Sequence, residues 1–399
     1  MRIPCSNGFP MVDTLDHLPP LPLIVNYGHT GLTKLTEQDE LRLSHALRLH
    51  DRVYHVDLCL PPSILHKVFV LLDGQFTILE HLSLKFSTTS KNSVPLTLPK
   101  AFLAPNLRHL ALPSTGPPRR LRVLTSTVSL VTLELSKIQS SSYFQPRALV
   151  ARLASLPNLR NLSIEFSVPI PRPSTERELL GEQGASVTLP SLTNLRFKGV
   201  GAYLESLVAQ IRAPLLERLR VTLFNQIALA LPHLFHLINI TEALELSRTT
   251  VNFDPKEISV TAASSTRSKG PVRLYVLCQP LDWQIDCAAL ICNALIPALS
   301  GVEQLMLYHN SGEIPTQLRN GAIESTSWHD LLRSFTGVKR LYINDELLEE
   351  LSRALQMDEV RLDPGFLPNL RYITAKDNLF TSFIDTRQVI GRPVQFVTG

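Results

Sequence analysis

One six-residue phrase, LxxLxL with aliphatic substitutes, recurs along almost the whole chain and constrains the fold more than any other feature. Start-to-start spacings run from 23 residues, between Leu107 and Leu130, to 36 residues, between Val302 and Val338. Each spacing has room for one short strand and a return segment. The clear copies begin at Val53, Leu79, Leu107, Leu130, Leu159, Leu192, Leu216, Val302, Val338 and Leu370, and two degenerate copies begin at Thr241 and Pro271.

Many return segments carry apolar residues at the helical period of 3.6. Examples are QPRALVARLASL from Gln145, AYLESLVAQI from Ala202 and DELLEELSRAL from Asp345. A unit of this size cannot bury its leucines alone, so neighbouring units must stack. We therefore predict an α/β right-handed solenoid, with parallel strands on the concave face and helices on the convex face.

The chain divides into three parts by pattern. Residues 1–50 read as a proline-rich extended segment followed by a capping helix from Thr36 to His50, with Thr36 as its N-cap. The solenoid is predicted over 51–378, with about 12 irregular repeats. Two polar insertions, at 168–190 and 254–270, are expected to project from it as loops. Residues 379–399 form a C-terminal tail for which the pattern predicts no structure.

These phrases resemble the leucine-rich-repeat superfamily, in the long-repeat form with helices on the convex side, over about Val53 to Ala375. Whole phrases such as LPPLPLIVNY from Leu18, LPKAFLAPNLRHL from Leu98 and VEQLMLYH from Val302 are similar to the fungal F-box-like leucine-rich-repeat proteins. In that family a helical F-box precedes the repeats and docks on the adaptor subunit of a cullin ubiquitin ligase, while the repeats hold a substrate. No LPxEIL-type phrase opens this chain, so the resemblance covers a repeat region without a recognisable F-box. It implies a cullin adaptor as partner only if an upstream F-box exists.

Composition excludes several classes of protein. The chain is 44% hydrophobic and 19% charged, which argues against disorder. A net charge of +4 over 399 residues argues against a continuous track for phosphates, so we expect no nucleic acid partner. No apolar run has the length of a bilayer span and no signal peptide opens the chain, so no membrane partner is expected. With only five scattered cysteines, the sequence predicts a cytoplasmic or nuclear protein.

Motifs for chemistry are absent from the sequence. It holds no GxSxG, HExxH, GxxxxGK or CxxC phrase. Gly199 and Gly201 flank a strand-to-helix junction but lack the third glycine of a dinucleotide site, so we interpret them as a tight turn. Cys278, Cys287 and Cys292 are interpreted as buried small hydrophobes rather than metal ligands. The sequence therefore predicts no enzyme, no catalytic residue, no metal and no cofactor.

Strand alternation places the third and fifth positions of each phrase on the solvent side of the sheet. A ladder of three histidines there either shares a metal or consists of ordinary exposed side chains; its members are His55, His81 and His109. A basic group either takes an acidic segment or is simply solvated; its members are Arg196, Lys198, Arg218 and Arg220.

A third group gathers tyrosine, methionine and arginine, the residue types that carry binding energy at interfaces. We predict that it binds a protein partner as one patch, unless a loop or the tail folds over it. Its members are Tyr275, Met306, Tyr308, Arg340, Tyr342 and Tyr372.

The leading hypothesis is a non-enzymatic protein–protein interaction module whose concave face binds a protein partner, with substrate recognition for a cullin-type ubiquitin ligase as its specific form. The alternative is a scaffold or truncated relative with no ligase link. A hydrolase or nucleotide-using enzyme is the alternative from another class, and no motif supports it.

Overall fold

A computed structural model describes most of the chain, and its contacts divide into two compact units. The first unit comprises Met1–Gly199 and Ala209–Leu215, and the second comprises Val200–Val208 and Leu216–Gly399. Each is described by itself. The described residues are 2–4, 21–27, 36–86, 98–113, 123–139, 143–169, 186–224, 231–241, 246–264, 272–278, 281–310, 325–356 and 365–399.

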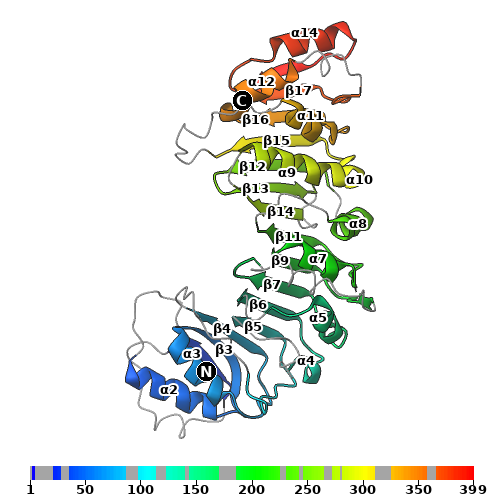
Figure 1. Ribbon diagram of the computed structural model, residues 1–399. Coiled ribbons are helices and arrows are strands. Elements are labelled where there is room, and N and C mark those ends of the chain that lie inside the picture. Colours follow the sequence, from blue (N-terminus) through cyan, green and yellow to red (C-terminus); the bar gives the residue numbers. More distant parts are fainter. Residues whose placement is uncertain are drawn as a thin grey trace. The chain divides into compact units, whose positions relative to one another are not determined.

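The first unit contains one run of parallel strands in sequence order, as Figure 1 shows. The phrases predicted as strands form these elements, and the sheet also takes in two strands of the segment that we expected to be merely extended. Side chains along β7 alternate between a buried leucine face and an opposite, polar face, and much of β3 follows the same pattern. The strands are β1 (Arg2–Pro4), β2 (Leu23–Tyr27), β3 (Val53–Leu60), β4 (His81–Phe86), β5 (His109–Pro113), β6 (Thr132–Ile138), β7 (Asn161–Phe166) and β9 (Asn194–Gly199).

The return segments of the first unit carry helices α2 (Glu37–Arg48), α3 (Pro62–Leu71), α4 (Val123–Ser126) and α5 (Pro146–Leu153). A separate two-stranded pairing joins β8 (Val187–Thr188) to β10 (Ile211–Arg212). Part of the predicted insertion at 168–190 is therefore β-structure, and its residues 170–185 lie outside the described residues.

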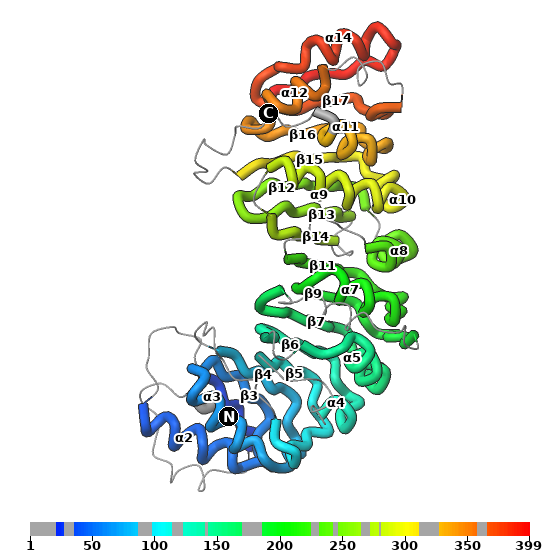
Figure 2. Tube along the Cα trace, viewed as in Figure 1, coloured from blue at the N-terminus to red at the C-terminus, as the bar shows by residue number. Residues whose placement is uncertain are grey.

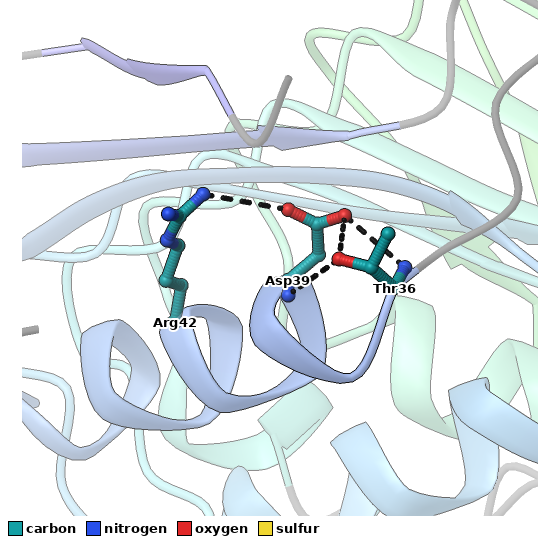
Figure 3. Close-up of polar contacts among 3 residues, drawn as sticks. All are labelled: Thr36, Asp39 and Arg42. Atoms are coloured by element: carbon teal, nitrogen blue, oxygen red, sulfur yellow. Dashed lines mark hydrogen bonds and ion pairs between the residues drawn. The ribbon is translucent and has the colours of Figure 1, made fainter. Parts of the chain in front are cut away.

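The helix predicted from Thr36 to His50 is present as α2, with Thr36 as its N-cap, but β1 and β2 extend the sheet beyond β3. The Thr36 hydroxyl accepts a hydrogen bond from the Asp39 backbone N–H at 3.2 Å, and an Asp39 carboxylate oxygen accepts one from the Thr36 backbone N–H at 3.1 Å. This reciprocal capping box satisfies two backbone donors that the first turn would otherwise leave unpaired. Arg42 extends the network, with its guanidinium 3.7 Å from the second Asp39 oxygen (Figure 3).

The second unit departs from a purely parallel repeat. Its strands lie in the spatial order β11 (Arg218–Leu223), β14 (Val272–Leu277), β13 (Glu257–Ala263), β12 (Arg248–Asp254), β15 (Gln304–His309), β16 (Arg340–Ile343), β17 (Tyr372–Ala375) and β18 (Gln395–Thr398). Strand β13 runs antiparallel to both of its neighbours, and the other pairings in this unit are parallel. Figures 1 and 2 show β12, β13 and β14 side by side in this reversed order.

One sequence prediction fails in this region. The segment 254–270 is not a projecting loop throughout, because Glu257–Ala263 forms β13, in which Ile258, Val260 and Ala262 are buried. That alternation of period two is what holds the segment in the sheet. The strand expected from Thr241 falls mostly on residues 242–245, which lie outside the described part of the chain; β12 at Arg248–Asp254 is a strand that the sequence did not predict.

The helices of the second unit pack mainly on one another and on β12 and β13. α9 contacts both strands and α11, and α11 in turn contacts α12. Residues 379–399, for which no structure was predicted, continue the repeat with a helix and the edge strand β18. The helices are α7 (Gly201–Val208), α8 (Pro232–Ile240), α9 (Leu281–Ala294), α10 (Ile296–Leu299), α11 (Ser325–Arg333), α12 (Leu348–Leu355) and α14 (Thr381–Val389), with a short 3₁₀ turn at Asp345–Leu347.

The repeated leucines form the core, as predicted. Leu110, Leu133 and Leu162 lie in register on β5, β6 and β7, and each is at most 1% exposed. Cutting one such leucine to alanine costs about 2 to 5 kcal/mol. Each unit therefore has the α/β repeat architecture that the sequence predicts, in which mostly parallel strands are joined by return segments that carry helices. In the described part of the chain, no helix combines the length and apolar character needed to cross a bilayer.

Candidate functional site

The candidate partner site lies on the polar face of the second unit, where strand register places side chains in rows. One row joins Gln304, Arg340 and Tyr372, and the next joins Met306, Tyr342 and Thr374. Neighbouring strands lie about 4.8 Å apart, so residues in one row are in reach of each other. Tyr308 stands one row further along β15. We call Met306, Tyr308, Arg340, Tyr342 and Tyr372 the tyrosine cluster.

Contacts link two pairs of side chains within the tyrosine cluster and leave them partly or fully exposed. The Arg340 guanidinium lies 5.3 Å from the centre of the Tyr372 ring, a cation–π contact. The Tyr308 hydroxyl donates to the Met306 sulfur at 3.6 Å. Tyr308 is 40% exposed, Arg340 is exposed, and the other members are partly exposed. The cluster thus offers aromatic surface in a fixed arrangement.

Tyr275 does not belong to this cluster. Strands β13 and β12 lie between β14 and β15, so Tyr275 is in the row of Tyr308 but three strands, or about 14 Å, away from it. Its ring instead contacts the Arg220 guanidinium on β11 at 5.0 Å. The prediction of a single patch from Tyr275 to Tyr372 is therefore corrected. That prediction assumed that strands lie side by side in sequence order. The antiparallel hairpin of β12 and β13 reverses this order, because β14 pairs with β13 and β15 pairs with β12.

The sequence missed polar-face residues on the hairpin itself. Arg248, Thr250 and Asn252 on β12 stand in the rows of Gln304, Met306 and Tyr308. The Thr250 hydroxyl lies 3.9 Å from the Met306 sulfur, and Arg248 Nε donates to Gln304 Oε1 at 3.1 Å. Period-two alternation in RTTVNFD, which starts at Arg248, is the signal that would have found them.

Histidines 55, 81 and 109 do form the predicted ladder, on the first unit. Their rings stack face to face, with centroids 4.0 Å apart in both pairs and interplanar angles of 9° and 2°. Imidazole lone pairs lie in the ring plane, so three parallel rings at this spacing cannot direct their nitrogens to one metal at about 2 Å. The described residues contain no group of three His, Cys, Asp or Glu suited to a metal ion.

Burial sets the protonation of this ladder. Desolvation, and after it the neighbouring His109 and His55, lower the pKa of His81 to about 4, although Asp57 acts in the opposite direction. Desolvation also lowers the pKa of His109. The His81 and His109 rings are therefore neutral at pH 7. The same row continues as a hydrogen-bonded series, in which Asn194 Nδ2 donates to Asn161 Oδ1 and Asn161 Nδ2 donates to Thr132 Oγ1.

The predicted basic group separates into different environments. Arg196 on β9 forms an ion pair with Glu165 at 2.8 Å, so this charge is balanced within the first unit. Arg218 and Arg220 lie on β11 in the second unit, exposed and on the polar face.

The other candidate motifs have packing roles. A Cβ on Gly199 would lie 2.7 Å from the Phe197 ring and 2.8 Å from Phe166, so the close approach of these rings requires glycine there.

Cys278, Cys287 and Cys292 are buried, as predicted. The Cys287 thiol donates to Cys278, which raises the pKa of Cys287 and lowers that of Cys278. Burial alone raises the pKa of Cys292.

Comparisons with known proteins find matches among solved structures. No protein-family model matches the chain, and no curated protein matches it. Among solved structures, the chain is similar to the leucine-rich repeat-containing protein LegL7 from Legionella pneumophila. The identity is 12% and the TM-score 0.31, over 93% of this chain and 99% of that one.

Proposed function

We propose that this protein is a non-enzymatic protein–protein interaction module that binds a protein partner on the polar face of β15, β16 and β17. The observation that carries the proposal is the tyrosine cluster. Tyrosine and arginine supply large contact area at low entropy cost, and they dominate the binding energy of protein interfaces. A strand face that served only solubility would carry lysine, glutamate and serine at these positions.

A double variant tests the proposal. Replacing Arg340 and Tyr342 by alanine removes two central members of the cluster, so affinity for the partner should fall by about 2 kcal/mol, roughly 30-fold. Both side chains point away from the core, so the melting temperature should stay nearly constant. The measurement is quantitative affinity purification from extracts, followed by titration with the captured partner.

The matched control is Tyr54→Ala, because Tyr54 is also an exposed strand tyrosine but lies on β3 in the first unit. This variant should capture the partner as the wild type does. Unchanged capture by the double variant, or a large loss of its stability, would assign the tyrosine cluster to packing instead of binding.

The specific form of the proposal is substrate recognition for a cullin-type ubiquitin ligase, in the cytoplasm or nucleus. It rests on the resemblance of the repeat phrases to fungal F-box-like proteins. Within these 399 residues no phrase has the pattern of an F-box. Purified chain should therefore bind the cullin adaptor weakly or not at all in a titration. Tight binding would show that an adaptor site exists among these residues and would contradict the expectation.

A further inference from the structure

Five arginines share the polar face of the second unit with the tyrosine cluster. Register places Arg220 directly opposite Arg273, in the row that continues to Thr250 and Met306. Arg248 and Arg340 flank Gln304 in the adjacent row, and Arg218 lies two residues before Arg220 on β11. We call these five residues the arginine rows. All five side chains are exposed.

None of the five arginines forms an ion pair with a described carboxylate. Their recorded contacts are with neutral groups: Arg220 with the Tyr275 ring, Arg340 with the Tyr372 ring and Arg248 with Gln304. By contrast, Arg196 on the first unit meets Glu165 at 2.8 Å. Like charges directly opposite each other on neighbouring strands, as at Arg220 and Arg273, destabilise a sheet. The positive charges of the arginine rows repel each other and are not balanced by a described carboxylate. Such an array is complementary to an anion from outside the chain.

We propose that the arginine rows bind an extended acidic segment of the protein partner, which crosses the strands from β11 to β16. This inference rests on the proposed function and specifies the chemistry of the partner. Five strand steps of about 4.8 Å span roughly 24 Å, and an extended chain advances about 3.3 Å per residue. About seven residues therefore cover the rows. Arginine suits this role because its fork of donors binds carboxylates in a bidentate manner.

Carboxylates at the far end of the hairpin favour a peptide over a nucleic acid. Asp254 and Glu257 are opposite each other on β12 and β13. Asp254 lies four residues, or about 13 Å, along β12 from Thr250 on the same face. A single extended chain fits on the arginine rows without reaching these carboxylates. A duplex, whose major groove alone is about 12 Å wide, would bring phosphates against them.

The test uses a defined probe and the full chain. A fluorescent nine-residue peptide of alternating glutamate and serine is titrated at low salt, and the same peptide with glutamine for glutamate is the neutral control. We expect the acidic peptide to bind and the neutral one not to bind. The double variant Arg248→Gln and Arg273→Gln should weaken binding about tenfold or more, whereas Arg353→Gln on α12 should leave it unchanged.

Two further measurements complete the test. Replacing Arg248 and Arg273 by lysine keeps the charge and should retain most of the binding, which separates a charge effect from misfolding. Binding of the acidic peptide by the wild type should weaken strongly as salt is raised from about 50 to about 500 mM, because the distance over which charges attract each other becomes shorter as ionic strength rises. Three results would overturn the inference. They are binding that does not depend on salt, equal binding of the acidic peptide by the Arg248→Gln and Arg273→Gln double variant, and tighter binding of a single-stranded oligonucleotide of equal charge.

The two proposals fail separately. If the acidic peptide does not bind while the Arg340 and Tyr342 double variant still loses the natural partner, the inference about acidic chemistry falls and the interaction function stands. If the peptide binds but the double variant captures the partner normally, the arginine rows are confirmed and the role of the tyrosine cluster falls.

Discussion

At the scale of single residues, the histidine ladder links burial to pH. His81 is stacked between His55 and His109, and the charged groups that act on it are Asp57 and Lys85. Its pKa is about 4 in the folded protein, against about 6.5 in an unfolded chain. Between these values the unfolded state binds more protons than the folded state. The contribution of His81 to stability is therefore complete above about pH 6.5 and is lost as the pH falls toward 4.

Replacing His81 by phenylalanine should flatten this pH dependence, because the ring stack remains but its central proton site is gone. For a half-buried ring, we expect the wild type to lose about 1 to 2 kcal/mol more than the variant between pH 7 and pH 4.5. Circular dichroism during urea unfolding at both pH values measures the difference. His233→Asn, at an exposed position on α8, is the control and should follow the wild type. Identical slopes for His81→Phe and wild type would contradict the assignment.

Arg387 on α14 is the buried charge with the clearest structural role. It is 1% exposed, and its guanidinium donates to the carbonyls of Phe366 at 3.0 Å and Leu367 at 2.9 Å. Leu367 has a positive φ of 41°, which a leucine adopts only under constraint. Hydrogen bonds from a charged donor contribute about 1.5 to 3 kcal/mol each. Arg387 therefore fixes the segment that leads into β17.

Arg387→Ala should lower the free energy of unfolding of the second unit by about 3 to 5 kcal/mol, because two buried carbonyls lose their donor. Both tryptophans, Trp283 and Trp328, lie in this unit, so their fluorescence during denaturant unfolding reports on it. Arg371→Ala, at an exposed position beside β17, should change stability by less than about 0.5 kcal/mol. A similar, small effect of both substitutions would show that the Arg387 contacts are not stabilising.

At the scale of elements, regular repeats were predictable and the irregular hairpin was not. Each LxxLxL phrase predicts its strand because three leucines at fixed offsets are buried only when strands stack, as Leu110, Leu133 and Leu162 are. Strands β12 and β13 carry no such phrase. Their pattern is ordinary alternation of valine, isoleucine and phenylalanine with polar residues, which the spacing of repeats does not anticipate.

The same hairpin decided how far the candidate site could be predicted. Tyr342 and Met306 were correctly placed next to each other, because β15 and β16 follow in sequence and in space. Tyr275 was misplaced, because β13 and β12 separate β14 from β15. Which strands pair with each other depends on where the chain turns back. The sequence prediction places the turn at Pro255 and Lys256 within a loop, so it does not anticipate the pairing of β12 with β13. Side-chain direction follows from local alternation, but lateral neighbours require the topology.

At the scale of the whole molecule, the division into two units predicts that each can lose its structure separately. Repeat proteins gain stability from repeats and from contacts between neighbours, so damage spreads only as far as those contacts. Leu133 is fully buried on β6 in the first unit, while both tryptophans lie in the second. Tryptophan fluorescence thus separates unfolding of the second unit from unfolding of the first.

Leu133→Asp should unfold the first unit, because an unpaired carboxylate would lie in an apolar core at a cost of several kcal/mol. Circular dichroism should fall and proteolysis should increase before residue 199, while Trp328 keeps its native emission. Thr132→Asp, the neighbouring position on the polar face of β6, is the matched control and should stay folded. Leu307→Asp on β15 should give the converse result, with altered Trp328 emission. Loss of both signals together in Leu133→Asp would mean that the chain unfolds as one cooperative body, because only coupled cores transmit a local defect that far.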